Sequence, residues 1–239
     1  MKENKNIIIG VIIVIIVIIL GCFVGCKLFN VVKYKTDFTN EEYKDIVNRL
    51  QVKGIINVKS TLINDDEYIN YDGLKIRNDF KDYEIVHNDD NHIAYENKEK
   101  NILISISGLT ESIVDKIKND DFLKLKEKDL VYILEKNNIK NDYDLIKYIS
   151  NQKTKNNNIF TSTKKMKENY FMYFATYNHM SVGENISLIE GDYEGYILNM
   201  YDIKSIHIIK DNKTYAFTLS NVSDSYVKEL LSTIRIEDN

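Results

Sequence analysis

The sequence of 239 residues lacks proline and tryptophan altogether and contains only two cysteines. So few cysteines exclude a disulfide-stapled scaffold, and a hydrophobic share of 44% excludes a disordered chain. Lys and Arg number 32 against 36 Asp and Glu, so the chain also lacks the basic excess with which nucleic-acid-binding proteins neutralise phosphates. We therefore expect a globular protein that does not bind nucleic acid and is long enough for one domain or two small ones.

Short catalytic motifs are absent as well. The sequence has no HExxH zinc motif, no GxSxG nucleophile elbow, no phosphate-binding GxxxxGK[ST] and no dinucleotide-binding GxGxxG. Both cysteines lie at the end of an apolar run, where a thiol cannot pair with a histidine of a soluble site. We predict a protein without catalytic residues, bound metal or cofactor. The alternative is an envelope enzyme whose Asp, Glu and His residues are scattered along the chain.

The longest apolar run extends from Ile7 to Cys26, 20 residues without a charged side chain. At about 1.5 Å per residue, a helix of this length spans roughly 30 Å, the thickness of the hydrocarbon core of a bilayer. We predict a transmembrane anchor over 7–26, a cytoplasmic tail over 1–6 and a body outside the cell. The lysines on the two sides of the run nearly balance, so this orientation rests on the short polar tail and the long globular body.

Cys22 and Cys26 stand at the far end of this run and are candidate sites of lipid attachment. The tetrapeptides ILGC and FVGC that end at these cysteines resemble the lipobox of bacterial lipoproteins, in which a Leu-like residue, a small residue and Gly or Ala precede the lipidated Cys. Each departs from that pattern, because Leu20 is large for its place and Phe23 replaces the usual Leu. A cleaved lipoprotein signal is therefore the alternative to an uncleaved helix, and both hold the protein at the cell membrane.

Residues 27–67 are predicted to form a juxtamembrane spacer followed by a helix. Thr39 and Glu42 fit a capping box, in which the hydroxyl and the carboxylate satisfy free amides at a helix start. An apolar stripe with helical spacing follows from Tyr43 to Leu50, and Gly54 marks the expected end of the helix.

From Tyr68 onward the hydrophobic pattern shifts towards a period of two, which indicates strands. A helical insertion at about 110–150, with Asn141 as the cap of one helix, separates the first strands from the last. Ser223 begins a closing helix with an apolar stripe. Residues 68–239 are therefore predicted to be one extracytoplasmic α+β domain, an antiparallel sheet packed by helices. The expected strands are 74–76, 83–87, 92–96, 102–107, 171–177, 186–190, 196–201, 206–210 and 214–219.

The order of these elements resembles the PsbP-like α/β/α sandwich, a fold of photosystem extrinsic subunits and of many bacterial lipoproteins. The resemblance implies a sandwich domain of a membrane-anchored protein or lipoprotein, used for binding or docking, and it brings no catalytic residues to transfer. The segments that carry it are Gly73 to Ile76, Tyr83 to Val86, Ile102 to Ser107, the hairpin Ile206 to Leu219 and the helix leading to Ile236.

His87 and His92 bracket the acidic Asp89 and Asp90, a pattern that raises the question of a metal site. A zinc site needs a third protein ligand at a defined spacing, and the sequence does not show which neighbouring residue would supply it. We interpret the segment as a solvated hairpin loop, a common place for acidic residues.

One aromatic-rich segment has apolar groups on both faces of its expected strand. Tyr170, Phe171, Tyr173 and Tyr177 belong to it, and such a strand needs cover on its second face. The helical insertion is the economical cover and a partner protein is the alternative, so these four residues form the candidate interaction patch. Taken together, the sequence predicts a non-catalytic, membrane-anchored protein of the bacterial cell envelope that binds a protein or a small ligand outside the cell.

Overall fold

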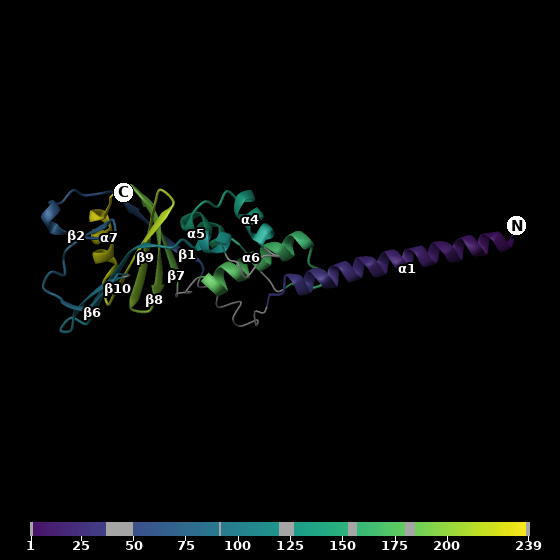
Figure 1. The fold of residues 1–239 in the computed structure, drawn as a ribbon, viewed down its shortest axis with the longest axis horizontal. Helices are drawn as coiled ribbons and strands as arrows, with labels where there is room; N and C mark the ends of the chain where they lie inside the picture. Colours follow the sequence, from purple (N-terminus) through teal and green to yellow (C-terminus); the bar gives the residue numbers. More distant parts are fainter. Residues whose placement is uncertain are drawn as a thin grey trace.

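The structure is a computed structural model that describes residues 2–36, 50–90, 92–119, 127–152, 157–179 and 185–237. Within these residues the body is built around a sheet of eight strands. A helical layer packs against one face of this sheet, and helix α7 (Asp224–Thr233) with a small second sheet packs against the other (Figure 1). The chain is therefore a mixed α+β protein, as the sequence predicts.

The large sheet has the strand order β1-β7-β8-β9-β10-β6-β5-β4. Its neighbouring strands are antiparallel except β1 and β7, which run parallel. The second sheet has the order β11-β3-β2, and a short 3-10 helix, η1 (Asp65–Glu67), leads into β2. The strands are β1 (Val52–Val58), β2 (Tyr68–Tyr71), β3 (Leu74–Arg77), β4 (Glu84–Asn88), β5 (Ile93–Asn97), β6 (Ile102–Thr110), β7 (Asn185–Gly191), β8 (Glu194–Met200), β9 (Ile203–Lys210), β10 (Lys213–Ser220) and β11 (Arg235–Ile236).

The hairpin of β9 and β10 shows how local sequence sets the two faces of the sheet. Asp211 and Asn212 turn the chain with φ of 51° and 61°, a left-handed backbone that short polar residues tolerate. This turn fixes the register, so side chains alternate along β9. Ile206 and Ile208 enter the core beneath α7, whereas His207 faces the helical layer.

Two hydrophobic clusters of the described residues flank the sheet. The first joins the sheet to α7 and β3 and contains fully buried Leu74 and Phe217. The second joins the sheet to the helical layer and contains Leu145 and Phe171. Each such side chain contributes about 1.5–3 kcal/mol through burial. The helical layer consists of α3 (Ile113–Asn119), α4 (Glu127–Lys136), α5 (Asp142–Ser150) and α6 (Thr163–His179).

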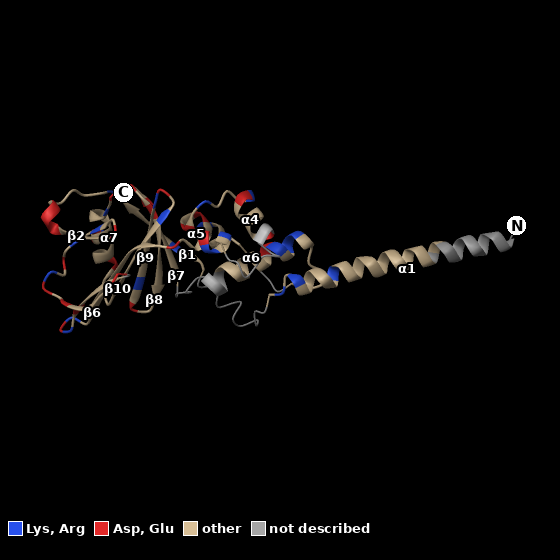
Figure 2. Cartoon of the chain, viewed as in Figure 1, with Lys and Arg blue, Asp and Glu red and all other residues tan. Residues whose placement is uncertain are grey.

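Helix α1 (Lys2–Lys33) projects away from the body (Figure 1). Its stretch Val14–Lys33 is long and apolar enough to cross a membrane, and no other described helix meets that test. Large apolar side chains along this stretch are exposed. In Figure 2 the described part of α1 is tan, without charged residues, until it nears the body. A candidate membrane span therefore precedes the globular part.

The end of α1 is packed against the helical layer rather than separated from it by a spacer. The Tyr34 ring is 2% exposed, and its hydroxyl donates a hydrogen bond to Asp129 of α4. Lys167 of α6 donates to the same carboxylate at 2.5 Å, and Lys33 lies 3.5 Å from it. Asn157 adds a bond from its side-chain amide to the Tyr34 carbonyl at 2.7 Å. The segment expected to be a spacer thus continues α1 to Lys33 and then joins the body.

The strand predicted over 171–177 is wrong, because these residues belong to helix α6. Buried Met166, Tyr170 and Phe174 recur every four residues, so the segment carries a helical stripe as well as the alternation that suggested a strand. Gly54 also differs from expectation, since it lies inside strand β1 instead of ending a helix. The helix predicted between Thr39 and Leu50 falls almost wholly on 37–49, outside the described residues.

Other local predictions are confirmed. Asn141 caps α5 by accepting a hydrogen bond from the Asp144 amide, and Ser223 caps α7 by accepting one from Tyr226. Helices α3, α4 and α5 lie in the segment 110–150 where the helical insertion was expected, and α6 extends the helical segment beyond it.

Candidate functional site

A cavity of about 250 Å³ lies between the sheet and the helical layer. Strands β8 and β9 form its floor, because Tyr196 pairs directly with His207 and Leu198 with Ser205, which places these four side chains on one face. The rest of the lining comes from the ends of β6 and β8, from β10, from α3 with the residue Glu111 before it, and from the start of α5. These lining residues are Thr110, Glu111, Ile113, Lys116, Asp142, Met200 and Thr214.

Asp142 holds the wall of this cavity together. Its carboxylate is 1% exposed and accepts hydrogen bonds from the Ser112 hydroxyl at 2.8 Å and from the Thr214 hydroxyl at 3.2 Å. It also accepts from the backbone amides of Ile113 at 3.0 Å and Val114 at 2.9 Å, the free amides at the start of α3. This carboxylate therefore ties α3, α5 and β10 together and is fully occupied by that role.

The imidazole of His207 lies flat against the Tyr196 ring, with 4.6 Å between ring centroids and 8° between planes. Burial lowers the pKa of His207 to about 4, so the ring is neutral at pH 7. Its Nε2 shares a hydrogen bond of 2.9 Å with the Ser205 hydroxyl, and the tautomer decides which atom donates.

The Tyr196 hydroxyl is the unusual group of the site. It is buried and has no hydrogen-bond partner among the described residues. Burial and then the charge of Asp142 raise the pKa of Tyr196 well above its ordinary value, so the phenol stays protonated and can donate. A buried polar group without a partner costs about 1–3 kcal/mol, which a bound acceptor in the cavity would recover.

The cavity has room for a small molecule, but it contains only part of a set of catalytic residues. Ser205 and His207 are hydrogen-bonded in the way that a nucleophilic hydroxyl and its general base are in an enzyme. Within the described part of the chain, no carboxylate hydrogen-bonds the His207 ring, because Asp142 is engaged by its four other donors. The orienting group of a Ser-His-Asp arrangement is therefore missing from the geometry.

A second hollow, of about 420 Å³, lies between β1, β7, β8 and the start of α7. Four of its polar side chains bond one another: Lys204 pairs with Asp224 at 2.7 Å, and the Asn199 amide donates to Asn185 at 2.9 Å. We place the candidate site in the smaller cavity because that one contains a buried group whose hydrogen bond is unmade.

The structure buries two of the four residues of the candidate interaction patch. Tyr170 and Phe171 are 6% and 0% exposed inside the helical layer, and Tyr170 contacts the Tyr34 ring edge-on at 6.0 Å. Tyr173 is half-buried, and the side chain of Tyr177 lies outside the described residues. The buried pair thus packs the core that the helical layer shares with the sheet.

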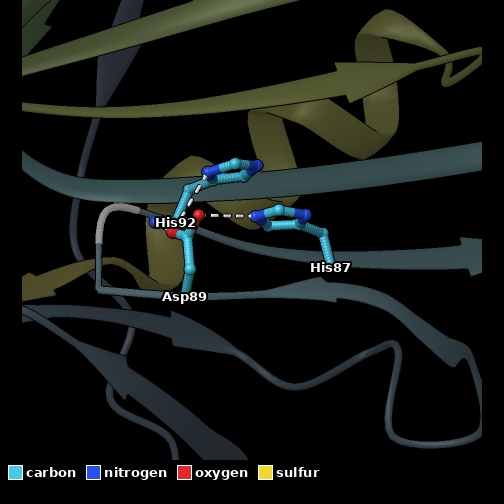
Figure 3. Close-up of side chains that lie close together, drawn as sticks. All are labelled: His87, Asp89 and His92. Atoms are coloured by element: carbon cyan, nitrogen blue, oxygen red, sulfur yellow. Dashed lines mark hydrogen bonds and ion pairs between the residues drawn. The ribbon is translucent and has the colours of Figure 1, made fainter.

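Cys22 and Cys26, the candidate lipid-attachment residues, are both exposed on α1. His87 and His92 lie together with Asp89 where β4 turns into β5 (Figure 3). The cavity residues were not predicted as a site, because they come from strands and helices far apart in sequence. The Ser-x-His spacing of β9 was the only local signal among the residues that line it.

Comparison with protein-family models, with curated proteins and with solved structures gives no match to this chain. The site is therefore interpreted from its own geometry.

Proposed function

We propose that this protein is a non-catalytic binding protein, anchored in the cell membrane, that takes a small neutral polar molecule in the cavity between β8, β9 and α3. The observation that carries the proposal is the buried Tyr196 hydroxyl, which lacks a partner and lines the cavity. The α+β body is proposed to be a PsbP-like domain and to lie outside the cell.

The character of the ligand follows from the cavity. Lys116 and Glu111 at its rim lie 3.8 Å apart and offset each other, and His207 is neutral. Hydroxyls and one imidazole therefore face apolar Leu198 and Met200 without an unpaired charge. The cavity is smaller than the roughly 300–1,000 Å³ pockets that hold drug-sized ligands, so we expect a molecule the size of a monosaccharide or an amide.

Membrane anchoring is supported by the way α1 meets the body. Lys27, the first charged residue after the apolar run, donates from Nζ to the Thr161 carbonyl at 3.0 Å. The neighbouring Phe160 is 89% exposed and Ile159 is 45% exposed. This loop therefore lies level with the end of the apolar run, where aromatic side chains favour the membrane interface.

Ligand binding is tested with the full-length chain in detergent, by measuring the shift in Tm with a panel of neutral sugars, polyols and small amides. We expect one compound class to raise Tm, and Tyr196→Phe and Ser205→Ala to abolish that rise. Tyr193→Phe is the matched control, because the Tyr193 hydroxyl is buried elsewhere and bonds the Leu231 carbonyl at 2.5 Å. A compound that stabilises Tyr196→Phe as strongly as the unaltered protein contradicts the proposed site.

The mode of anchoring is tested by the intact mass of the protein purified from membranes. The full-length mass supports an uncleaved helix. A chain that begins at Cys22 or Cys26 and carries a diacylglycerol establishes the lipoprotein alternative. Protease treatment of intact cells tests the orientation, and protection of residues after Lys27 would contradict an external body.

The alternative function is that of an envelope enzyme, favoured by the 2.9 Å hydrogen bond between Ser205 and His207. Hydrolysis of p-nitrophenyl acetate by the full-length protein provides the test. A burst of p-nitrophenol that Ser205→Ala abolishes would support an acyl-transfer enzyme over a binding protein.

A further inference from the structure

Three metal-ligating side chains converge at the turn between β4 and β5. His87 Nε2 lies 2.7 Å from one carboxylate oxygen of Asp89, and His92 Nδ1 lies 3.5 Å from the other. The two imidazoles are stacked, with 4.1 Å between centroids and 10° between planes. Figure 3 shows the carboxylate of Asp89 beside the stacked rings and in contact with both histidines. One ligand atom from each residue lies within 4.8 Å of the other two.

Asp89 and His92 are held in place by hydrogen bonds that involve no ion. The Asp89 amide donates to the His92 carbonyl at 3.1 Å, and the His92 amide donates to the Asp89 carboxylate at 2.9 Å. The Tyr71 hydroxyl, from the second sheet, donates to the Asp89 carbonyl at 2.9 Å. Two of the three ligands are therefore already positioned by hydrogen bonds, which lowers the entropy lost on binding.

We propose that His87, Asp89 and His92 form a binding site for one divalent transition-metal ion, of which zinc is the representative. Two imidazoles and one carboxylate are a ligand set that zinc accepts, whereas calcium and magnesium take oxygen ligands. The site is exposed, so water or a group from another molecule completes the coordination. This site lies on the β4–β5 hairpin and does not depend on the proposed ligand cavity.

The geometry requires only a small adjustment to accept the ion. Bonds of about 2.0–2.1 Å in a tetrahedral site place ligand atoms about 3.4 Å apart. The present separations run from 2.7 Å to at most 4.8 Å. His87 and Asp89 are exposed and His92 is half-buried, so rotation about their side-chain bonds closes this difference without disturbing the core.

The test is calorimetric titration of tag-free, full-length protein in detergent with Zn²⁺, after treatment with a chelator. We expect one equivalent to bind and to be released by EDTA. His87→Gln, Asp89→Asn and His92→Gln are each expected to weaken binding at least about tenfold. Asp89→Asn retains an oxygen that accepts the His92 amide, so it removes the charge while leaving the turn in place.

Asp90→Asn is the matched control, because it removes the neighbouring exposed carboxylate and should leave the Zn²⁺ affinity unchanged. Substitution with Co²⁺ provides a second readout, since two imidazole ligands alter its visible absorption. The proposal is overturned by an absence of saturable Zn²⁺ binding, or by equal affinity in the unaltered protein and the His87→Gln/His92→Gln double variant. Circular dichroism that matches the unaltered protein establishes that each variant is folded.

Discussion

The ring of Tyr196 lies on the imidazole of His207, one strand away, so that the unpartnered hydroxyl and the neutral histidine face the same cavity. Both residues affect the free energy of unfolding, each for a different reason. The phenol contributes a hydroxyl whose hydrogen bond is unmade, and the histidine must stay uncharged in order to remain where it is.

Removal of that hydroxyl is expected to stabilise the unliganded protein. Tyr196→Phe should raise the free energy of unfolding by about 1 kcal/mol, because the variant no longer buries an unsatisfied donor. Tyr193→Phe should have the opposite sign and a similar size, because it breaks a bond to the Leu231 carbonyl. Urea denaturation in detergent measures both. Destabilisation by Tyr196→Phe as large as that by Tyr193→Phe would mean that the hydroxyl is already satisfied in solution.

His207 is expected to make the protein sensitive to acid. Burial lowers the pKa of His207 from 6.5 to about 4, so between these values the unfolded chain binds a proton that the folded chain does not. The free energy of unfolding is therefore unaffected by this proton above pH 6.5. It decreases by up to about 3 kcal/mol as the pH falls from 6.5 towards 4. His207→Phe keeps an aromatic ring on Tyr196 and should flatten this dependence. Parallel stability curves for the two proteins between pH 4 and 6.5 would contradict the assignment.

Asp142 is expected to be a structural residue of the cavity wall. Asp142→Ala leaves two hydroxyls and two amides without their acceptor and should lower the free energy of unfolding by about 3 kcal/mol. Asp142→Asn retains one acceptor oxygen and should cost less. Asp144→Ala is the control two residues away, since that half-buried carboxylate accepts, among the described residues, only from the Lys140 amide and its loss should cost under about 1 kcal/mol. Thermal and urea unfolding give the ranking.

Phe160 is expected to lie at the membrane surface. In a Cys22→Ala/Cys26→Ala background, an environment-sensitive fluorophore on Phe160→Cys should shift its emission to the blue when the protein is placed in anionic vesicles. Tyr201→Cys is the control, because that side chain is 82% exposed on the β8–β9 turn of the body. If the labels at positions 160 and 201 give the same emission spectrum as each other, both in vesicles and in detergent, the Phe160 loop lies away from lipid.

Sequence patterns predicted the parts of the fold that depend on neighbouring residues. The turn at Asp211 and Asn212 and the cap at Ser223 are local arrangements, so spacing was enough to find them. Helix α6 was missed because its aromatic residues satisfy a period of two and a helical period at once, and only packing against Tyr34 and the sheet distinguishes them.

The candidate sites could be predicted only in part, for the same reason. The bonds of Asp142 to Ser112 and Thr214 span 30 and 72 residues, and no local pattern records such contacts. The hairpin histidines were visible in sequence. The approach of Asp89 to both histidines depends on the turn, and therefore required the structure.

The contacts of Tyr34 with Asp129 have a mechanical consequence. A helix that ends in a flexible tether lets its domain tumble freely, whereas α1 is interlocked with α4 and α6 through Tyr34, Asp129 and Lys167. Rotation or tilt of α1 must therefore be transmitted as torque to the helical layer. Because that layer also forms one wall of the cavity, a change in the angle between α1 and the body in the proposed membrane-anchored protein is expected to change the shape of the cavity.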